Sequence, residues 1–361
     1  MIAMLIAAGF SLLYSLLLTP LFVRGFNKLR WGQPIRVDGP KDHETKRGTP
    51  TMGGLIFISG SVIAYFVGKL VMGETPTPSA LLVILMAVGA GLVGFIDDLM
   101  KTRMQNSAGL GGWAKIVGQV VIAVSFALLG LQFADHHGLT PVSTHISVFR
   151  DLPFDFMSLG VIAGTILVIL WVMVIVTATT NAVNVTDGLD GLAAGASIFA
   201  FGSYVIIGFW QAAQNCATTA GEPACYEVRD PMDLAVIAAA FLGGVAGFLW
   251  WNTNPAQIFM GDTGSMGIGG AIAALAILSR TEVLLVLIGG LFIIETGSVI
   301  LQRVYFKVTK GKRIFRMSPI HHHFELKGWA EVTIVVRFWI IAGLFAIVGI
   351  GSFYAEWVLS Q

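Results

Sequence analysis

Long apolar runs recur along the whole chain, and short polar stretches separate them. A helix needs about 20 mostly apolar residues to cross a bilayer, and ten runs approach or exceed this length. We therefore predict ten membrane-spanning helices, at Ile2–Val23, Gly53–Met72, Ala80–Ile96, Ile116–Phe133, Met157–Ala178, Leu189–Trp210, Leu234–Trp251, Ser265–Leu278, Val283–Phe306 and Val332–Trp357. The eighth run is shorter than the others and rich in glycine.

The composition supports the same class of fold. Only 12% of the 361 residues are charged and 55% are hydrophobic, whereas about 25% of residues are charged in a typical soluble domain. The apolar runs leave no room for a soluble domain, so we predict one all-α, polytopic transmembrane domain over residues 1–361. A net charge of +1 gives no basic field that would attract nucleic acid, and we expect no such partner.

Positive charges gather in alternate loops between the predicted spans. All but four of the 22 Lys and Arg residues lie in these loops or just inside the last span; the exceptions are Lys69, Arg150, Arg229 and Arg280. Cytoplasmic loops of membrane proteins carry such an excess. We therefore place five loops in the cytoplasm, at 24–52, 97–115, 179–192, 252–264 and 303–331. An even number of spans then puts both termini outside.

The two cysteines, Cys216 and Cys225, fall in one predicted outer loop. The outside is the oxidising side of a cell membrane, so a disulfide can form there. A separation of nine residues permits a bridge but does not demand one. The spacing therefore leaves a disulfide and two free thiols as open alternatives.

Aspartates come together on the predicted cytoplasmic face from three separate loops. They are Asp97 and Asp98 at the end of the third span, Asp187 and Asp190 at the start of the sixth, and Asp262 before the eighth. A helix N-terminus favours a carboxylate, so a helix cap or a turn is an alternative role for Asp187 and Asp262. The dipole opposes Asp97 and Asp98, which therefore need a cation, either Lys101 or a bound metal.

An all-oxygen site of this kind predicts Mg²⁺, which takes one or two carboxylates together with water and phosphate oxygens. Adjacent residues point about 100° apart on a helix. We therefore expect Asp97 and Asp98 to have different tasks, one toward the metal and the other toward a reacting group.

Two further stretches suit a phosphorylated ligand. "KRGTPTMGG" places Lys46 and Thr51 just before a helix N-terminus, where backbone N–H groups bind anions. A basic stop followed by a helix cap is the alternative. "SPIHHHFELKG" holds His321, His322 and His323. Three consecutive residues do not easily converge on one ion, so we favour hydrogen bonds to phosphate or to the leaving group over zinc.

Two single residues also stand out. Phe259 lies among polar neighbours and could stack on a planar base; the alternative is an aromatic at the membrane interface. Glu295 lies in the middle of the ninth span, where an acid is a functional candidate by default, but the sequence suggests no partner for it. There is no G-x-x-x-x-G-K-[ST] motif, which argues against a P-loop ATPase.

Taken in order, "RGTPTMGG", "FIDDLMK", "NAVNVTDGLDGLA", "NTNPAQIFMGDTG" and "PIHHHFE" closely resemble the phospho-N-acetylmuramoyl-pentapeptide transferase family. This bacterial family belongs to the polyprenyl-phosphate N-acetylhexosamine-1-phosphate transferase superfamily. The resemblance implies Mg²⁺-dependent transfer from UDP-N-acetylmuramoyl-pentapeptide to undecaprenyl phosphate in the plasma membrane, giving the first lipid intermediate of peptidoglycan and UMP. It also implies a homodimer.

The resemblance also implies roles for individual residues. Those matching Asp97, Asp98 and Asp262 are catalytic, with Asp262 on the metal and Asp97 as the base that deprotonates the lipid phosphate. We assign Asp98 as a second metal ligand. Lys101 and Lys115 match lysines near the phosphates, and the three histidines lie beside the pocket. The residues matching the nucleotide or inhibitor pocket are Lys46, Thr51, Asn184, Asp187, Asp190, Asn252 and Phe259.

Two rival functions remain. A sister enzyme that uses UDP-N-acetylglucosamine or another UDP-hexosamine would share the aspartates, but "PIHHHFE" argues against it. A secondary transporter would place ionisable residues at mid-helix and show internal repeats, whereas this chain has one mid-span acid and no repeat. Whether transfer takes one step or passes through a phospho-enzyme aspartate stays open.

Overall fold

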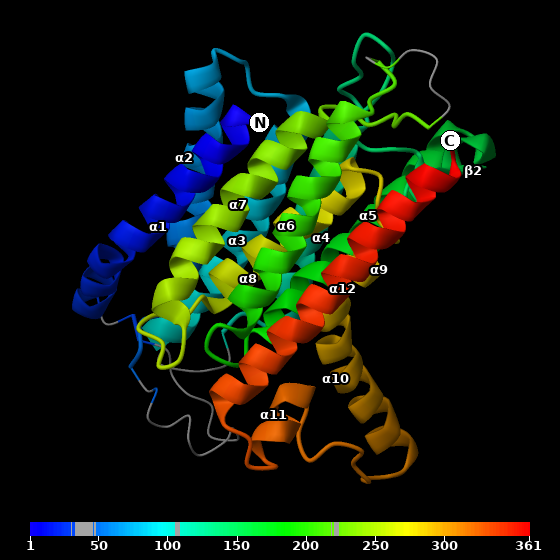
Figure 1. The fold of residues 1–361 in the computed structure, drawn as a ribbon. Helices are drawn as coiled ribbons and strands as arrows, with labels where there is room; N and C mark the ends of the chain where they lie inside the picture. Colours follow the sequence, from blue (N-terminus) through cyan, green and yellow to red (C-terminus); the bar gives the residue numbers. More distant parts are fainter. Residues whose placement is uncertain (30, 33–45, 47, 105–108, 218, 220–223) are drawn as a thin grey trace.

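The computed structural model describes residues 1–29, 31–32, 46, 48–104, 109–217, 219 and 224–361. The described chain forms a bundle of long helices, with both termini at one end of the bundle (Figure 1). We call this end the hairpin end, because it also carries a small β-hairpin. The opposite end, which carries α11 and the first residues of α2 and α8, is called the site end.

Nine helices of the described chain are long and apolar enough to cross a membrane. They are α1 (Ile2–Lys28), α2 (Gly54–Met72), α3 (Pro78–Met104), α4 (Gly112–Gly130), α5 (Val161–Thr186), α6 (Leu192–Ala213), α7 (Pro231–Asn252), α8 (Gly261–Leu278) and α12 (Glu331–Leu359). Each contains most or all of one predicted span, so nine of the ten predicted spans are confirmed.

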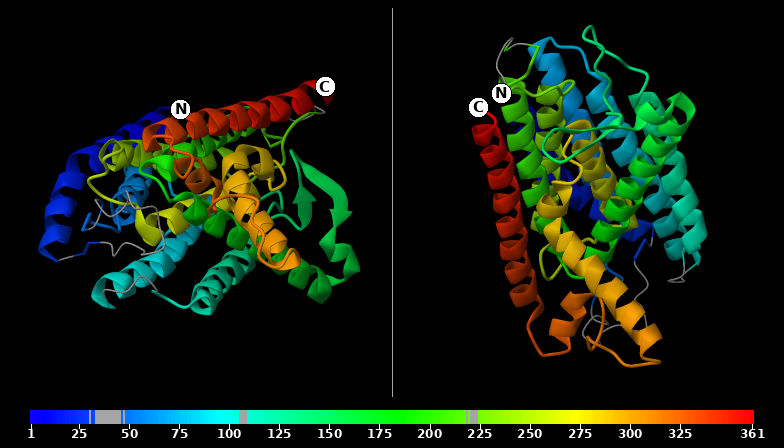
Figure 2. Two further views of the ribbon diagram at one scale, coloured as in Figure 1. Left: turned by 90° about the horizontal axis from the view of Figure 1, so that it is seen from below. Right: turned by 90° about the vertical axis from the view of Figure 1, so that its right-hand side faces the viewer.

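The ninth predicted span, Val283–Phe306, is wrong as a single helix. It is divided into α9 (Leu285–Ile288) and α10 (Gly290–Val308), with Gly289 between them. Neither part alone is among the nine candidate spans of the described residues, but together they run from the hairpin end to the site end, which fits both termini lying at one end. Polar residues on α10, including Glu295 and Gln302, lower its apolar content, and α10 leaves the bundle at an angle toward the site end (Figures 1 and 2).

Two predicted helix ends also differ from the structure. The α3 helix continues to Met104, so Asp97 and Asp98 lie inside it rather than at its end. The α5 helix continues to Thr186, so Asp187 caps its C-terminus, and α6 begins only at Leu192. Asp187 and Asp190 therefore occupy a turn between two helices and do not open α6. In both places the helix continues past its apolar run because polar residues of the site pair with its last turns.

The α8 helix lies at the centre of the bundle. Every one of its residues except Asp262 is buried. Its small residues allow close approach of its neighbours: a Cβ built on Gly54 of α2 would lie 2.3 Å from Gly264, and one on Gly269 would lie 2.5 Å from the backbone of Thr180 in α5. Small residues are used in this way where membrane helices pack closely. This packing explains the short, glycine-rich eighth span.

The hairpin end is closed by two antiparallel strands, β1 (His145–Ser147) and β2 (Asp151–Asp155), followed by the short helix η2 (Phe156–Leu159). Asp151 pairs with Arg280 after α8, and the Ser147 amide donates to Glu282 over 2.9 Å. These contacts join the hairpin to the α8–α9 connection.

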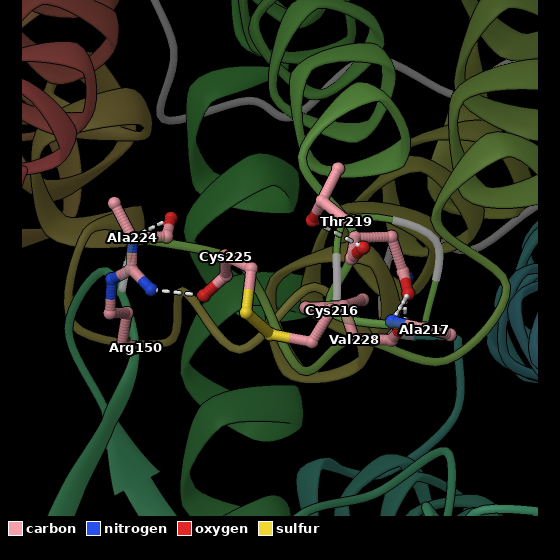
Figure 3. Close-up of a disulfide and its surroundings, with 8 residues drawn as sticks. Arg150, Cys216, Ala217, Thr219, Ala224, Cys225 and Val228 are labelled. Carbon is pink, nitrogen blue, oxygen red and sulfur yellow. Dashed lines mark hydrogen bonds between the residues drawn. A yellow bond between two sulfur atoms is a disulfide. The ribbon is translucent and has the colours of Figure 1, made fainter. Parts of the chain in front are cut away.

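Cys216 and Cys225 form a disulfide at the hairpin end, which settles the alternative that their spacing left open (Figure 3). Arg150 lies beside it and donates to the carbonyl groups of Ala224 and Cys225. Arg150 also pairs with Glu356 of α12 at 2.9 Å. The loop between α6 and α7 is thereby tied to the hairpin and to the last helix.

Candidate active site

Three carboxylates meet at the site end of the bundle. Asp97 and Asp98 come from α3 and Asp262 from the first turn of α8, and one oxygen of each lies within 4.8 Å of the others. Within the described parts of the chain, this is the one group of His, Cys, Asp or Glu side chains with the spacing of a metal site. Residues 164 positions apart are thus neighbours, as the resemblance implies.

Glycine brings the two helices close enough for this contact. A Cβ built on Gly94 of α3 would lie 2.1 Å from the carbonyl oxygen of Asp262. Gly261 opens α8 with φ +72°, a conformation that glycine adopts without steric cost, and a Cβ there would lie 2.5 Å from an oxygen of Asp98. Both positions therefore leave room for the carboxylates to meet.

Asp98 binds the N-terminus of α8. Its two oxygens accept hydrogen bonds from the backbone N–H groups of Asp262 and Thr263, at 3.1 and 2.9 Å, and from the Thr263 hydroxyl at 2.7 Å. The side chain is only 3% exposed. The positive end of the α8 dipole therefore offsets the charge of Asp98. From the sequence we expected Lys101 or a metal to compensate the charges of both aspartates of α3. For Asp98, the N-terminus of α8 also compensates the charge.

Two lysines join the other two carboxylates. Lys101 lies 2.6 Å from Asp97 and 3.1 Å from Asp262, and Lys115 of α4 lies 2.9 and 2.6 Å from the same two groups. Asn184 of α5 donates to the remaining oxygen of Asp262 at 3.0 Å. The pairing of Lys101 with Asp97 confirms that a cation compensates this buried acid. The two lysines therefore bridge Asp97 and Asp262.

A second polar group lies at the turn between α5 and α6. Lys46 pairs with Asp190 at 2.8 Å and with Glu331 of α12 at 2.6 Å. Glu331 also accepts from the Asp190 amide at 2.9 Å and from Asn254 at 2.8 Å. Burial lowers the pKa of Lys46, but its hydrogen bonds to the two carboxylates outweigh this effect and raise the pKa. Four segments far apart in the sequence therefore meet at one ion pair.

Asp187 lies in the same turn, and the charges of Asp262, Asp98 and Asp190 act on it. Burial, followed by the charges of Asp262 and Asp98, holds the pKa of Asp187 well above its usual value. A bound cation would relieve this repulsion, which fits an aspartate-rich site.

The other predicted pocket residues contribute in different ways. Asn252 is 2% exposed and holds the loops together, because it accepts from the Gly191 amide at 3.1 Å and donates to the Ile258 carbonyl at 2.9 Å. Thr51 is buried beside Gly261, and its hydroxyl lacks a partner among the described residues. Phe259 pairs through its backbone with Pro50 and Gly53, which brings its loop against the start of α2.

The three histidines have three different partners. His321 Nδ1 lies 2.9 Å from Glu295 in α10, and His322 Nδ1 lies 2.5 Å from Glu325. His323 Nδ1 accepts from the backbone N–H of Arg316 at 3.0 Å. The three side chains therefore contact three different groups.

The sequence analysis missed Glu331, and for Glu295 it missed the partner. Glu331 precedes the last predicted span, and an acid at a helix N-terminus is ordinary there, so the sequence did not single it out. Glu295 was noticed, but its partner lies 26 residues further along the chain, in a different helix. Glu295 is visible in the sequence as an acid in the middle of a predicted span. No comparable feature of the sequence marks Glu331.

Comparison with known proteins gives a consistent result. The family described as glycosyl transferase family 4 matches residues 80–280, and a phospho-N-acetylmuramoyl-pentapeptide-transferase signature matches residues 46–58. Proteins named phospho-N-acetylmuramoyl-pentapeptide-transferase are similar over nearly the whole chain. The one from Clavibacter michiganensis is 63% identical over 99% of this chain and 100% of its own length, and the one from an Arthrobacter species is 55% identical over the same shares. The one from Streptomyces avermitilis is 52% identical over 97% of each chain. The chain therefore belongs to the phospho-N-acetylmuramoyl-pentapeptide-transferase family.

Proposed function

We propose that this protein transfers phospho-N-acetylmuramoyl-pentapeptide from its UDP derivative to undecaprenyl phosphate, forming the lipid-linked diphosphate sugar and releasing UMP. The observation that carries the proposal is the meeting of Asp97, Asp98 and Asp262 with Lys101 and Lys115 at one end of the bundle. Full-length similarity to transferases of that name supports it.

Transfer between two anions needs charge neutralisation and alignment of the reacting groups. The all-oxygen donor set suits Mg²⁺, and we assign Asp262 and Asp98 as its ligands. Asp262 is the residue of α8 that is not fully buried, and Asp98 has an oxygen with one hydrogen bond and a further lone pair. When bound, Mg²⁺ would neutralise charge on the diphosphate. Lys101 and Lys115 would then exchange carboxylate oxygens for phosphate oxygens.

The remaining assignments come from the family resemblance, and the positions of the residues support them. We assign Asp97 as the base for the lipid phosphate. Asn184, Asp187, Asp190, Lys46 and Thr51 surround the carboxylate cluster and the adjoining turn, where the nucleotide would lie, and Asn252 holds that turn. Phe259 would stack on the uracil, and His321, His322 and His323 would lie beside the diphosphate. We further expect a homodimer, as the family resemblance implies.

The site end is assigned to the cytoplasm and the hairpin end to the outside. The excess of Lys and Arg in the loops of the site end supports this orientation, and so does the disulfide at the hairpin end. A lipid substrate can then remain in the bilayer while the nucleotide arrives from the cytoplasm.

The function is tested with detergent-purified protein, UDP-N-acetylmuramoyl-pentapeptide and undecaprenyl phosphate, by measuring UMP with Mg²⁺ and with a chelator. We expect turnover that requires Mg²⁺ and that is lost in Asp262→Ala. Turnover with UDP-N-acetylglucosamine in place of the muramoyl donor would favour the sister enzyme. Activity of Asp262→Ala equal to that of the unchanged protein would refute the metal assignment.

The orientation has a separate test in intact cells. A membrane-impermeant maleimide, added after an impermeant reductant, should label Cys216 and Cys225. In a protein with both cysteines changed to serine, Lys312→Cys in the exposed α10–α11 loop should react only after permeabilisation. The reverse pattern would place the site end outside.

A further inference from the structure

Glu295 is fully buried in α10 and contacts the side chain of His321, which is also fully buried. The Nδ1 atom of His321 lies 2.9 Å from a carboxylate oxygen of Glu295. An ionised carboxylate can only accept a hydrogen bond, so this contact with an ionised Glu295 requires the proton on Nδ1. The carboxylate thereby fixes both the orientation of the ring and the proton on the nitrogen that faces it.

The opposite nitrogen of the ring faces the site. A Cβ built on Gly188 would lie 2.3 Å from His321 Nε2, so this nitrogen lies against the turn that holds Asp187 and Asp190. Nε2 is buried and has no hydrogen-bond partner among the described residues. A buried polar atom without a partner is costly, and here it is directed toward the turn beside the carboxylate cluster.

Glu295 belongs to a polar stripe on α10. Glu295, Ser298 and Gln302 are spaced for one helix face, and all three are buried. Ser298 accepts from the backbone N–H of Ile320 at 3.0 Å, and Gln302 accepts from that of Phe315 at 3.0 Å. Ser298 and Gln302 thus hold backbone groups of the segment that leads into α11, whereas Glu295 holds a side chain.

We propose that Glu295 is a positioning residue, which holds His321 so that Nε2 is presented to the diphosphate of the nucleotide substrate. This inference rests on the proposed function, because that function supplies the ligand. It also accounts for an acid within a predicted span. Where a carboxylate orients a metal-binding histidine, its removal lowers activity about 10–100-fold. We expect a loss of that order when Glu295 is removed.

The test compares Glu295→Leu and Glu295→Gln with the unchanged protein, measured as UMP release. We expect activity to fall in the order unchanged protein, E295Q, E295L. E295Q keeps the size and polarity of the side chain, so it separates a loss of positioning from a failure to fold. Thr296→Val is the matched control: its hydroxyl has no partner in the described chain, and its activity should be unchanged.

A double-mutant cycle separates positioning from a general structural role. If Glu295 acts through His321, E295L should cost little in a protein that already carries His321→Ala. An equal loss in both backgrounds would overturn the proposal, and so would full activity of E295L.

A spectroscopic measurement decides the inference independently of turnover. With ¹⁵N-labelled histidine, and with His321→Gln to assign the signal, Nδ1 of His321 should be protonated in the unchanged protein and its signal should change in E295L. An unprotonated Nδ1 would refute the positioning role even in an active enzyme. Absence of UMP from the unchanged protein would instead refute the proposed function, and the ¹⁵N signal would still decide the role of Glu295.

Discussion

Asp97 and Asp98 are adjacent in the sequence but bind different groups. Asp97 pairs with two lysines, whereas Asp98 accepts three hydrogen bonds from the start of α8. The two adjacent carboxylates thus face different groups, whereas a metal for one and a reacting group for the other stays a prediction. The structure adds that Asp98 also anchors α8, which the sequence did not suggest.

Asp98→Asn should therefore destabilise the fold as well as reduce activity. An asparagine has one acceptor oxygen, and its amide group would face N–H donors. A hydrogen bond to a charged group contributes about 1.5–3 kcal/mol, so we expect a loss of stability of that order, measured as a lower Tm in detergent. An Asp98→Asn protein that loses activity with an unchanged Tm would show that the anchoring contributes nothing.

Glu331 accepts hydrogen bonds from three residues of the second polar group. Glu331→Ala would leave Lys46, Asn254 and the Asp190 amide without their shared acceptor. Charge-assisted hydrogen bonds are worth about 1.5–3 kcal/mol each, so we expect KM for the UDP donor to rise about 10-fold or more. Glu227→Gln, at an exposed position near the hairpin end, is the control and should leave KM unchanged. An unchanged KM in Glu331→Ala would exclude Lys46 and Asp190 from donor binding.

The residues of the site differ in how visible they are in the sequence. Asp97, Asp98 and Asp262 stand out because acids are rare in so apolar a chain. The contacts of Asn252 and Glu331 depend on loops that meet only in three dimensions. The spacing of residues along the sequence does not show which loops contact one another. It therefore identified candidate residues but not their partners in other loops.

At the scale of helices, the close contact of α3 with α8 sets the distance between the carboxylates. Gly94→Ala would place a methyl group within 2.1 Å of the Asp262 carbonyl oxygen, which is backbone and cannot turn away. Overpacking of this kind costs about 1–3 kcal/mol. We expect α8 to be displaced from α3, with a lower Tm and a loss of most UMP release. Gly202→Ala in α6, where an added Cβ meets nothing within 4 Å, should change neither quantity. Normal activity in Gly94→Ala would show that the site tolerates a wider separation.

Helix number was easier to predict than helix ends. Apolar runs of sufficient length identified nine spans because the bilayer imposes that length. The ends differ where polar residues continue a helix, as at Met104 and Thr186. The break at Gly289 is also missed: α9 packs against α12, and α10 packs against α5, α11 and α12, contacts that hydropathy does not record.

Across the whole molecule, the two ends of the bundle have different chemistry. The site end brings cations and carboxylates together from six segments, whereas the hairpin end is held by a disulfide and by ion pairs around Arg150 and Arg280. The long helices connect the hairpin end, which stabilises the fold, to the site end, which carries the candidate active site. The stability of the hairpin end should therefore be measurable separately from turnover.

Glu282 makes the stability of the hairpin end depend on pH. Burial, with a smaller contribution from the charge of Asp151, raises the pKa of Glu282 to about 8, and the side chain is 6% exposed. The folded chain therefore favours the protonated acid. The stabilising contribution of Glu282 is complete below the unfolded pKa of about 4.3 and is lost as pH rises toward 8.

Glu282→Gln tests this pH dependence, because it keeps an acceptor for the Ser147 amide without a charge to bury. The Tm of the unchanged protein should fall between pH 6 and pH 9 more than that of Glu282→Gln, so the difference in favour of the variant should widen with pH. Two parallel Tm curves would mean that Glu282 stays ionised in the folded protein.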